Sequence, residues 1–328
     1  MFELTAENAA GYLHGRPEVP PDDWRVTALG GGVSNTVLLV EGDRLRFVMK
    51  QSLPKLRVEE DWFADRTRIL RECAAMRLLA PHLPPGAVPE ILFEDAGNCL
   101  FAMSAAPAAA RTWKALLLDG HAAIEIAERA GDIMAGMITA SWNSPQWEQI
   151  FGDQTAFDQL RLDPYYRFTA SRHPDLATHF EARIERARRR CCLVHGDWSP
   201  KNFLVAGEMV TAIDFEVIHY GDPSFDAGFL LNHLLLKSFY RPRWAALYAA
   251  LGRRFLEVVL SALPARADSF EAAACRHLGC LLLARIDGKS PAEYIREEAL
   301  RERIRRFARE IILEPPSTIA SIFERVVR

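Results

Sequence analysis

The sequence has few of the features that mark secreted, disulfide-bonded or membrane proteins. Its six cysteines show no C-x-x-C spacing, and residues 1–8 lack the basic-then-apolar pattern of a secretory signal. No uncharged apolar run approaches the ~18 residues that a membrane-spanning helix requires. These absences predict a cytoplasmic protein in a reducing compartment, with no membrane partner.

The chain also lacks a strong charge of either sign. Its formal net charge is -3, and 49% of its 328 residues are hydrophobic and 25% charged, as in ordinary globular proteins. No basic stripe with interleaved aromatics is present, which argues against a nucleic-acid partner. The basic run at residues 183–190 is interpreted as the solvated face of a helix.

One polar loop stands out between two apolar runs. Residues 195–202 read HGDWSPKN, so that Asp197 and Asn202 are five positions apart. In phosphoryl transfer a carboxylate orients the attacking hydroxyl and accepts its proton, and an amide oxygen nearby ligates magnesium on the phosphates. The spacing therefore predicts that Asp197 is the catalytic residue and that Asn202 is a metal ligand. His195 is expected to pack and hydrogen-bond beneath the loop and not to carry a proton.

A second carboxylate follows at the end of a short apolar strand. Residues 210–216 read VTAIDFE, and Asp214 is predicted to be the second metal ligand. Magnesium takes oxygen ligands and usually only one or two protein carboxylates, so Glu216 could reach the same site directly or through water. Each acid alone could simply cap a turn or a helix. Their order and their positions at strand edges favour the catalytic interpretation.

With the segment GDPSFDAGF at residues 221–229, the motifs H-G-D-x-x-x-x-N, I-D and G-D-P-x-x-D are complete. In these motifs the chain resembles the aminoglycoside phosphotransferase, choline kinase and methylthioribose kinase superfamily. The resemblance implies a protein-kinase-like α+β fold with two lobes, a small antiparallel-sheet N-lobe and a mainly helical C-lobe. It also implies that Asp226 is a buried structural carboxylate that braces the catalytic loop.

The amino-terminal part contains a glycine-rich turn at residues 30–35, between strands expected at 25–29 and 36–40. A turn between two strands argues against a Rossmann fingerprint, and no G-K-[ST] ending follows, which argues against a P-loop. Taken alone, the turn could be a plain hairpin. Its resemblance to a G-G-x-S-N turn implies a phosphate cradle that comprises Gly31, Gly32, Ser34 and Asn35.

The third expected strand ends near Lys50, where a kinase needs a cation for the α- and β-phosphates. A helix expected at residues 65–79 has one apolar face, and Glu72 borders that face as the partner of Lys50. Met103 is expected beside the nucleotide. These assignments predict an N-lobe at 1–103, a hinge at 104–110 and a C-lobe at 111–328.

Helices are expected to dominate the rest of the chain. Residues 122–138 have the periodicity of a buried core helix. Ser290 and Pro291 resemble a helix start, with a charged helix continuing through Ile312. A short terminal helix is expected at 317–327.

Only eleven residues separate Asp214 from Asp226, and no A-P-E signature follows, so the acceptor is expected to be a small molecule and not a protein. The superfamily resemblance implies acceptor contacts from later helices, whose polar residues here include Asn232, His233, Lys237, Tyr240 and Arg285. Asn232, His233 and Arg285 are the candidates. The pattern Asp214-x-Glu216 is similar to methylthioribose kinase. The twin arginines that hold that enzyme's substrate have only Arg285 as a possible counterpart here.

Together these motifs predict a kinase that uses ATP and Mg²⁺ and transfers the γ-phosphoryl group in line to a hydroxyl of a sugar or amino-alcohol. An aminoglycoside or choline-type phosphotransferase remains an alternative. So does a kinase-like protein that binds a nucleotide or metabolite without catalysis. The protein is expected to be a monomer or a homodimer.

Overall fold

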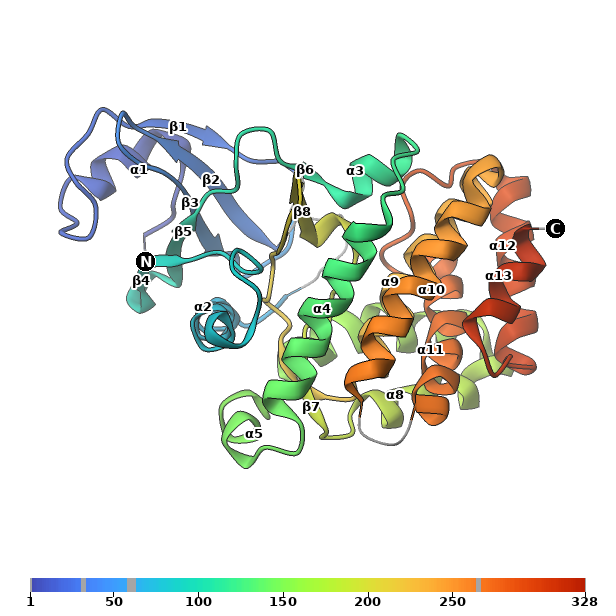
Figure 1. Ribbon diagram of the computed structural model, residues 1–328. Coiled ribbons are helices and arrows are strands. Elements are labelled where there is room, and N and C mark those ends of the chain that lie inside the picture. The colour runs from blue at the N-terminus through green and yellow to red at the C-terminus, as the bar shows by residue number, and fades with distance from the viewer. Residues whose placement is uncertain (1, 31–33, 58–62, 264–266, 328) are drawn as a thin grey trace.

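The computed structural model describes residues 2–30, 34–57, 63–263 and 267–327. A small lobe built on one β-sheet lies beside a larger lobe of helices, with the N-terminus at the sheet and the C-terminus at the far end of the helices (Figure 1). Gly31 and Gly32 of the predicted phosphate cradle lie outside the described residues.

The sheet of the small lobe has five antiparallel strands in the order β1-β2-β3-β5-β4. The strands are β1 (Arg25–Ala28), β2 (Asn35–Glu41), β3 (Arg46–Ser52), β4 (Ile91–Asp95) and β5 (Leu100–Ser104). The strands expected on either side of the glycine-rich turn are therefore present, and they pair antiparallel.

The alternation of side chains along β3 determines which way Lys50 points. Phe47 and Met49 are buried with helix α1 (Ala6–Leu13) on one face of the sheet, whereas Val48 packs into the main core on the other. Successive side chains of a strand point to opposite faces, so Lys50 lies on the same face as Val48. That face is covered by helix α2 (Arg68–Leu79).

Helix α2 begins three residues later than its periodicity predicts. The side chain of Asp65 accepts hydrogen bonds from the backbone N–H of Thr67, at 2.9 Å, and from its hydroxyl, at 2.7 Å. Such a local bond holds the backbone in a turn and competes with the helix. From Arg68 onward the predicted apolar face is buried, and Glu72 is buried with it.

The large lobe is mainly helical, with short strand pairs between the helices. Its helices are α3 (Trp113–Leu118), α4 (Ile124–Ser141), α5 (Pro145–Phe151), α6 (Thr155–Phe157), α7 (Phe168–Arg172), α8 (Ala177–Ala187), α9 (Ser224–Tyr240), α10 (Ala245–Ala262), α11 (Ala267–Asp287), α12 (Glu298–Leu313) and α13 (Ile319–Val327), with a π-helical segment η3 (Asp158–Arg167) after α6. Its strands are β6 (Arg111–Thr112), β7 (Cys192–Val194), β8 (Phe203–Ala206), β9 (Met209–Ala212) and β10 (His219–Gly221). Helix α9 is buried along almost its whole length and packs against α10 and α11.

Two sequence predictions for this lobe were wrong. Helix α12 begins at Glu298 and not at Pro291. The side chain of Arg285 donates a hydrogen bond to Oγ of Ser290 at 2.8 Å, and its backbone carbonyl accepts the N–H of Ala292, also at 2.8 Å. These contacts hold the segment after α11 in turns. The basic run after residue 183 is also more than a solvated face, because Arg186 lies 2.6 Å from the buried carboxylate of Asp222.

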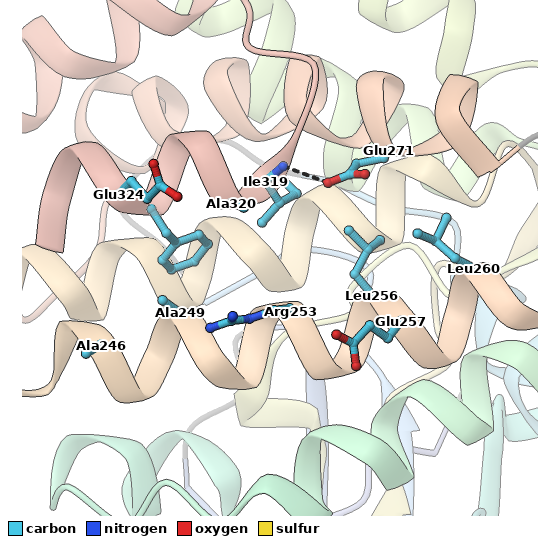
Figure 2. Close-up of a pocket in the computed structure, with 11 residues that line it drawn as sticks. Ala246, Ala249, Arg253, Leu256, Glu257, Leu260, Glu271, Ile319, Ala320 and Glu324 are labelled. Carbon is cyan, nitrogen blue, oxygen red and sulfur yellow. Dashed lines mark hydrogen bonds between the residues drawn. The ribbon is translucent and has the colours of Figure 1, made fainter.

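Helix α13 packs against α10 and leaves a cavity of about 430 Å³ (Figure 2). Its lining residues are Ala246, Ala249, Arg253, Leu256, Glu257, Leu260, Glu271, Ile319, Ala320, Phe323 and Glu324. None of them belongs to the predicted catalytic segments. Within the described ranges, no helix is both long enough and apolar enough to cross a membrane.

Candidate active site

Asp226 anchors the catalytic loop through the loop's backbone. Its carboxylate accepts the N–H of His195 at 2.7 Å and the N–H of Gly196 at 2.9 Å. Gly196 has a φ of +80°, and a Cβ there would lie 2.9 Å from the carbonyl oxygen of Val217. Burial raises the pKa of Asp226 to about 7, against the two backbone hydrogen bonds that lower it. The loop conformation therefore depends on this acid at the start of α9.

His195 lies beneath the loop as a neutral imidazole. Burial lowers its pKa to about 4, and its Nδ1 accepts the N–H of Asp197 at 3.1 Å. Its Nε2 lies 3.1 Å from the carbonyl oxygen of Ile213, which places the ring proton on Nε2. The ring packs against Phe215, with centroids 4.5 Å apart. These contacts use both ring nitrogens for structure.

The carboxylate of Asp197 is buried and surrounded by positive charge. Its Oδ2 lies 2.7 Å from Nη2 of Arg161 and 3.0 Å from Nζ of Lys201. Burial alone would raise the pKa of Asp197, but these two cations hold it well below its usual range. Arg161 comes from η3 and also donates to the carbonyl oxygen of Gly196 at 2.8 Å. The sequence reasoning missed Arg161, because no local pattern marks it.

Asn202 and Asp214 present oxygen atoms near this carboxylate. The side-chain amide of Asn202 donates to the carbonyl oxygen of Asp197 at 2.9 Å, which leaves its own oxygen free of hydrogen bonds from the described residues. Asp214 follows β9 with a φ of +70°, and among the described residues only its Oδ1 accepts a hydrogen bond, from Lys50. An amide oxygen and a carboxylate oxygen fit magnesium, which takes its remaining ligands from phosphate and water. No group of three His, Cys, Asp or Glu side chains within the described ranges could hold a metal ion by itself.

Lys50, Glu72 and Asp214 form a buried charge cluster. Nζ of Lys50 lies 2.8 Å from both carboxylate oxygens of Glu72 and 2.6 Å from Oδ1 of Asp214. Although burial disfavours its charge, the two carboxylates raise the pKa of Lys50 above its usual range. Glu72 also accepts the N–H of Phe215 at 3.1 Å. The cluster thus joins β3, α2 and the segment after β9.

Glu216 is placed differently from its expected role at the metal. Its Oε1 accepts the hydroxyl of Ser34 at 2.7 Å, and its Oε2 accepts the amide of Asn35 at 2.9 Å. Nε of Arg68, which the sequence reasoning did not single out, lies 3.1 Å from the same Oε2. Both oxygens are therefore engaged by the small lobe. Ser34 and Asn35 lie at the end of the glycine-rich turn, and their side chains donate hydrogen bonds to Glu216.

The side chain of Met103, which was expected beside the nucleotide, packs into the core on the face of Val48.

The profile of the phosphotransferase enzyme family matches residues 25–270. The chain belongs to this family. It is 26% identical over 278 residues to a methylthioribose kinase of Escherichia coli O45:K1, a match that covers 74% of this chain and 66% of that relative's length. This confirms the superfamily that the motifs indicated.

Solved structures of family-related proteins share the fold at low sequence identity. An amicoumacin kinase in complex with AMP-PNP, Ca²⁺ and Ami superposes with a TM-score of 0.57 at 17% identity, covering 92% of this chain and 91% of its own. A choline/ethanolamine kinase family protein from Mesorhizobium loti gives 0.52 at 16% identity and 98% of each chain. An APH(2")-IIa complex with streptomycin and ATP gives 0.51 at 14%, over 98% of this chain and 99% of its own. The predicted protein-kinase-like fold is confirmed.

The three acceptor candidates of this phosphotransferase-family chain lie on two packed helices. Asn232 and His233 belong to α9, and Arg285 belongs to α11. Asn232 is fully buried, and neither its amide nitrogen nor its oxygen has a hydrogen-bond partner in the described part of the chain. Arg285 donates to the hydroxyl of Tyr165, at 3.3 Å, and to Ser290.

Proposed function

We propose that the protein is an ATP-dependent small-molecule kinase that transfers the γ-phosphoryl group to a hydroxyl of its acceptor. The observation that carries the proposal is the charged, buried carboxylate of Asp197, held on a braced loop next to a complete Lys50–Glu72–Asp214 cluster. The family membership and the methylthioribose kinase relative support the same class of reaction.

Each part of the site has a role in this reaction. Lys50, kept charged by two carboxylates, neutralises the α- and β-phosphates of ATP. Asn202 and Asp214 would hold Mg²⁺, which supplies positive charge to the transferring phosphate when bound. Asp197 orients the acceptor hydroxyl for in-line attack. Because Arg161 and Lys201 stabilise its charge, orientation contributes more than proton affinity.

A small acceptor is favoured over a protein by the segment between the metal site and α9. Residues 215–226 are buried throughout, and part of the segment forms β10 against β7. A protein substrate needs an exposed segment on which its backbone can dock. A sugar or amino-alcohol acceptor similar to methylthioribose was the expectation from the sequence.

The test is phosphate transfer by the purified protein to a panel of sugars, sugar acids, amino-alcohols and aminoglycosides, with products identified by mass spectrometry. Asp197→Asn should reduce turnover by about 10²- to 10⁴-fold, with unchanged affinity for Mg²⁺-ATP. Asp43→Asn on the exposed turn before β3 is the matched control. ATP binding without transfer to any acceptor would favour a kinase-like binding protein, and near-normal turnover of Asp197→Asn would refute the mechanism.

A further inference from the structure

We propose that the acceptor carries an anionic group, a carboxylate or a phosphate ester, which Arg285 and Lys237 bind at the end of the site away from Asp197. This rests on the proposed kinase function and names the class of its acceptor. Two buried cations have no anionic partner among the described residues, and a row of side chains connects them to the carboxylate of Asp197.

Arg285 is buried among neutral groups. Its side chain is 8% exposed, and its Nη1 donates to the hydroxyl of Tyr165 and to the hydroxyl and carbonyl of Ser290. Among the described residues, its Nε has no hydrogen-bond partner and no carboxylate lies within ion-pair distance of its guanidinium. Burying a charge without a counter-ion is costly, so a buried unpaired arginine indicates a missing anion.

Lys237 is the second buried cation. It has no exposed surface, and among the described residues the only acceptor of its Nζ is the carbonyl oxygen of His233, one turn earlier in α9, at 3.3 Å. The ring of Tyr294 lies 5.5 Å from Nζ. Two of its three ammonium protons therefore have no acceptor in the described part of the chain.

The charged groups around Lys237 do not neutralise it. The pKa of Lys237 is lowered to about 7, mainly by burial and further by the positive charges of Lys114 on α3 and Arg285 on α11. The negative charge of Glu293, from the segment after α11, raises this pKa. Glu293 already forms an ion pair with Lys114. An anion placed near Nζ would supply the missing counter-charge.

A continuous row of side chains connects these cations with Asp197. The ring of Tyr165 lies between the two arginines, 5.8 Å from the guanidinium carbon of Arg161 and 5.9 Å from that of Arg285. Arg161 in turn forms an ion pair with Asp197. Arg285, Tyr165, Arg161 and Asp197 are therefore neighbours in one row, and the proposed acceptor would follow this row from Asp197 to Arg285.

Helix α9 contributes a second set of side chains beside this row. Phe229, His233 and Lys237 follow one another at four-residue intervals and therefore share a face of the helix. The ring of Phe229 lies 5.6 Å from that of Tyr165 and 5.4 Å from that of His233. Lys237 stands at the far end of the same row.

The distribution of charge decides the class of the acceptor. At the catalytic end, the positive charges of Arg161 and Lys201 face the negative charge of Asp197. In the proposed reaction, the transferred phosphate would add further negative charge there. At the far end, Arg285 and Lys237 have no counterpart, so an amino-alcohol or aminoglycoside would place its ammonium against two cations. A neutral sugar would leave both unpaired. A hydroxy acid or a phosphorylated sugar completes the balance.

The test uses matched acceptors that differ only in charge. The panel contains glycerol, glycerate and glycerol 3-phosphate; ribose, ribonate and ribose 5-phosphate; glucose, gluconate and glucose 6-phosphate; and choline and kanamycin as cations. Transfer from Mg²⁺-ATP is measured for the wild type, Arg285→Gln, Lys237→Met and the control Arg253→Gln in the remote cavity of Figure 2. Within the best set, the anionic member should exceed its neutral parent about tenfold or more in kcat/KM.

Arg285→Gln should raise KM for the anionic acceptor about thirtyfold or more, with a smaller change in kcat, and should leave KM for the neutral parent almost unchanged. Lys237→Met should act in the same direction, and Arg253→Gln should have no effect. The carboxylate and phosphate members of each set decide which anion is bound. A neutral or cationic acceptor as the best substrate, or equal losses on charged and neutral acceptors, would overturn the proposal and leave the kinase function intact.

A second measurement does not depend on turnover. Thermal unfolding without ATP should shift upward with the preferred anionic compound in the wild type and in Arg253→Gln, and not in Arg285→Gln. An Arg285-dependent shift without phosphate transfer to any acceptor would support the anion site and contradict the kinase function. Absence of a shift with every anionic compound, or an equal shift in Arg285→Gln, would refute the anion site.

Discussion

Replacing Lys237 with methionine should stabilise the folded protein at neutral pH. The amine is fully buried, and its pKa is lowered to about 7. The pKa of an exposed lysine is ~10.4, so burying this amine costs roughly 4 kcal/mol at neutral pH. Methionine fills a similar volume without a charge, so most of that cost should be recovered in Lys237→Met.

The gain should depend on pH in a defined direction. Because the pKa of Lys237 is lower in the folded state, the unfolded chain binds more protons between pH ~7 and ~10.5. The penalty for the wild type is full below that window and disappears as the pH rises through it. The stability difference between Lys237→Met and the wild type should therefore be largest below pH ~7 and vanish near pH ~10.5.

Urea unfolding at about pH 6, 8 and 10 measures this difference, provided both proteins unfold in two states with equal m-values. The matched control is Lys289→Met, since the side chain of Lys289 is 22% exposed and pairs with Asp163 at 3.1 Å. It should change stability by less than about 1 kcal/mol at each pH. Lower stability of Lys237→Met, or a gain in stability that is the same at every pH, would contradict a buried amine with a lowered pKa at this position.

Two further substitutions test the frame of the site. Gly196→Ala should destabilise the protein by about 1–3 kcal/mol in thermal unfolding, because the φ of Gly196 is +80° and the new Cβ would contact Val217. The control Gly207→Ala, at a φ of +60° with no atom near the new Cβ, should reduce stability less. Arg68→Met should cost about 3–5 kcal/mol in urea unfolding and raise KM for ATP, since Glu216 would be left as a buried charge; unchanged stability and KM would contradict the assigned role.

The pairing of Lys50 with Glu72 could be predicted because two local periodicities point to it. The period of two along β3 places Lys50 on the face of Val48, and the helical period of α2 places Glu72 beside the buried Ile69, Cys73 and Met76. When those two faces pack together, the charges meet at 2.8 Å. The motif order likewise indicated the fold, because it is shared by a whole family.

The partners of Asp197 and Glu216 could not be predicted in this way. Arg161 comes from η3, 36 positions before Asp197, and Arg68 lies 148 positions before Glu216. No periodicity connects residues so far apart in the chain. The start of α12 was missed for a different reason, because a contact of Arg285 with Ser290, five positions further along the chain, overrides the Ser-Pro start signal.

On the proposed function, the charges of the large lobe separate the residues that would perform the reaction from those that would select the acceptor. Asp197 lies with its own two cations on a loop whose backbone is fixed by Asp226, an arrangement that any hydroxyl acceptor can use. Arg285 and Lys237 lie beyond Tyr165 and take no part in that arrangement. The family motifs do not include Arg285 or Lys237, so the motifs alone do not predict the acceptor. The acceptor must therefore be inferred from buried charges that the protein itself does not balance, and here both are positive.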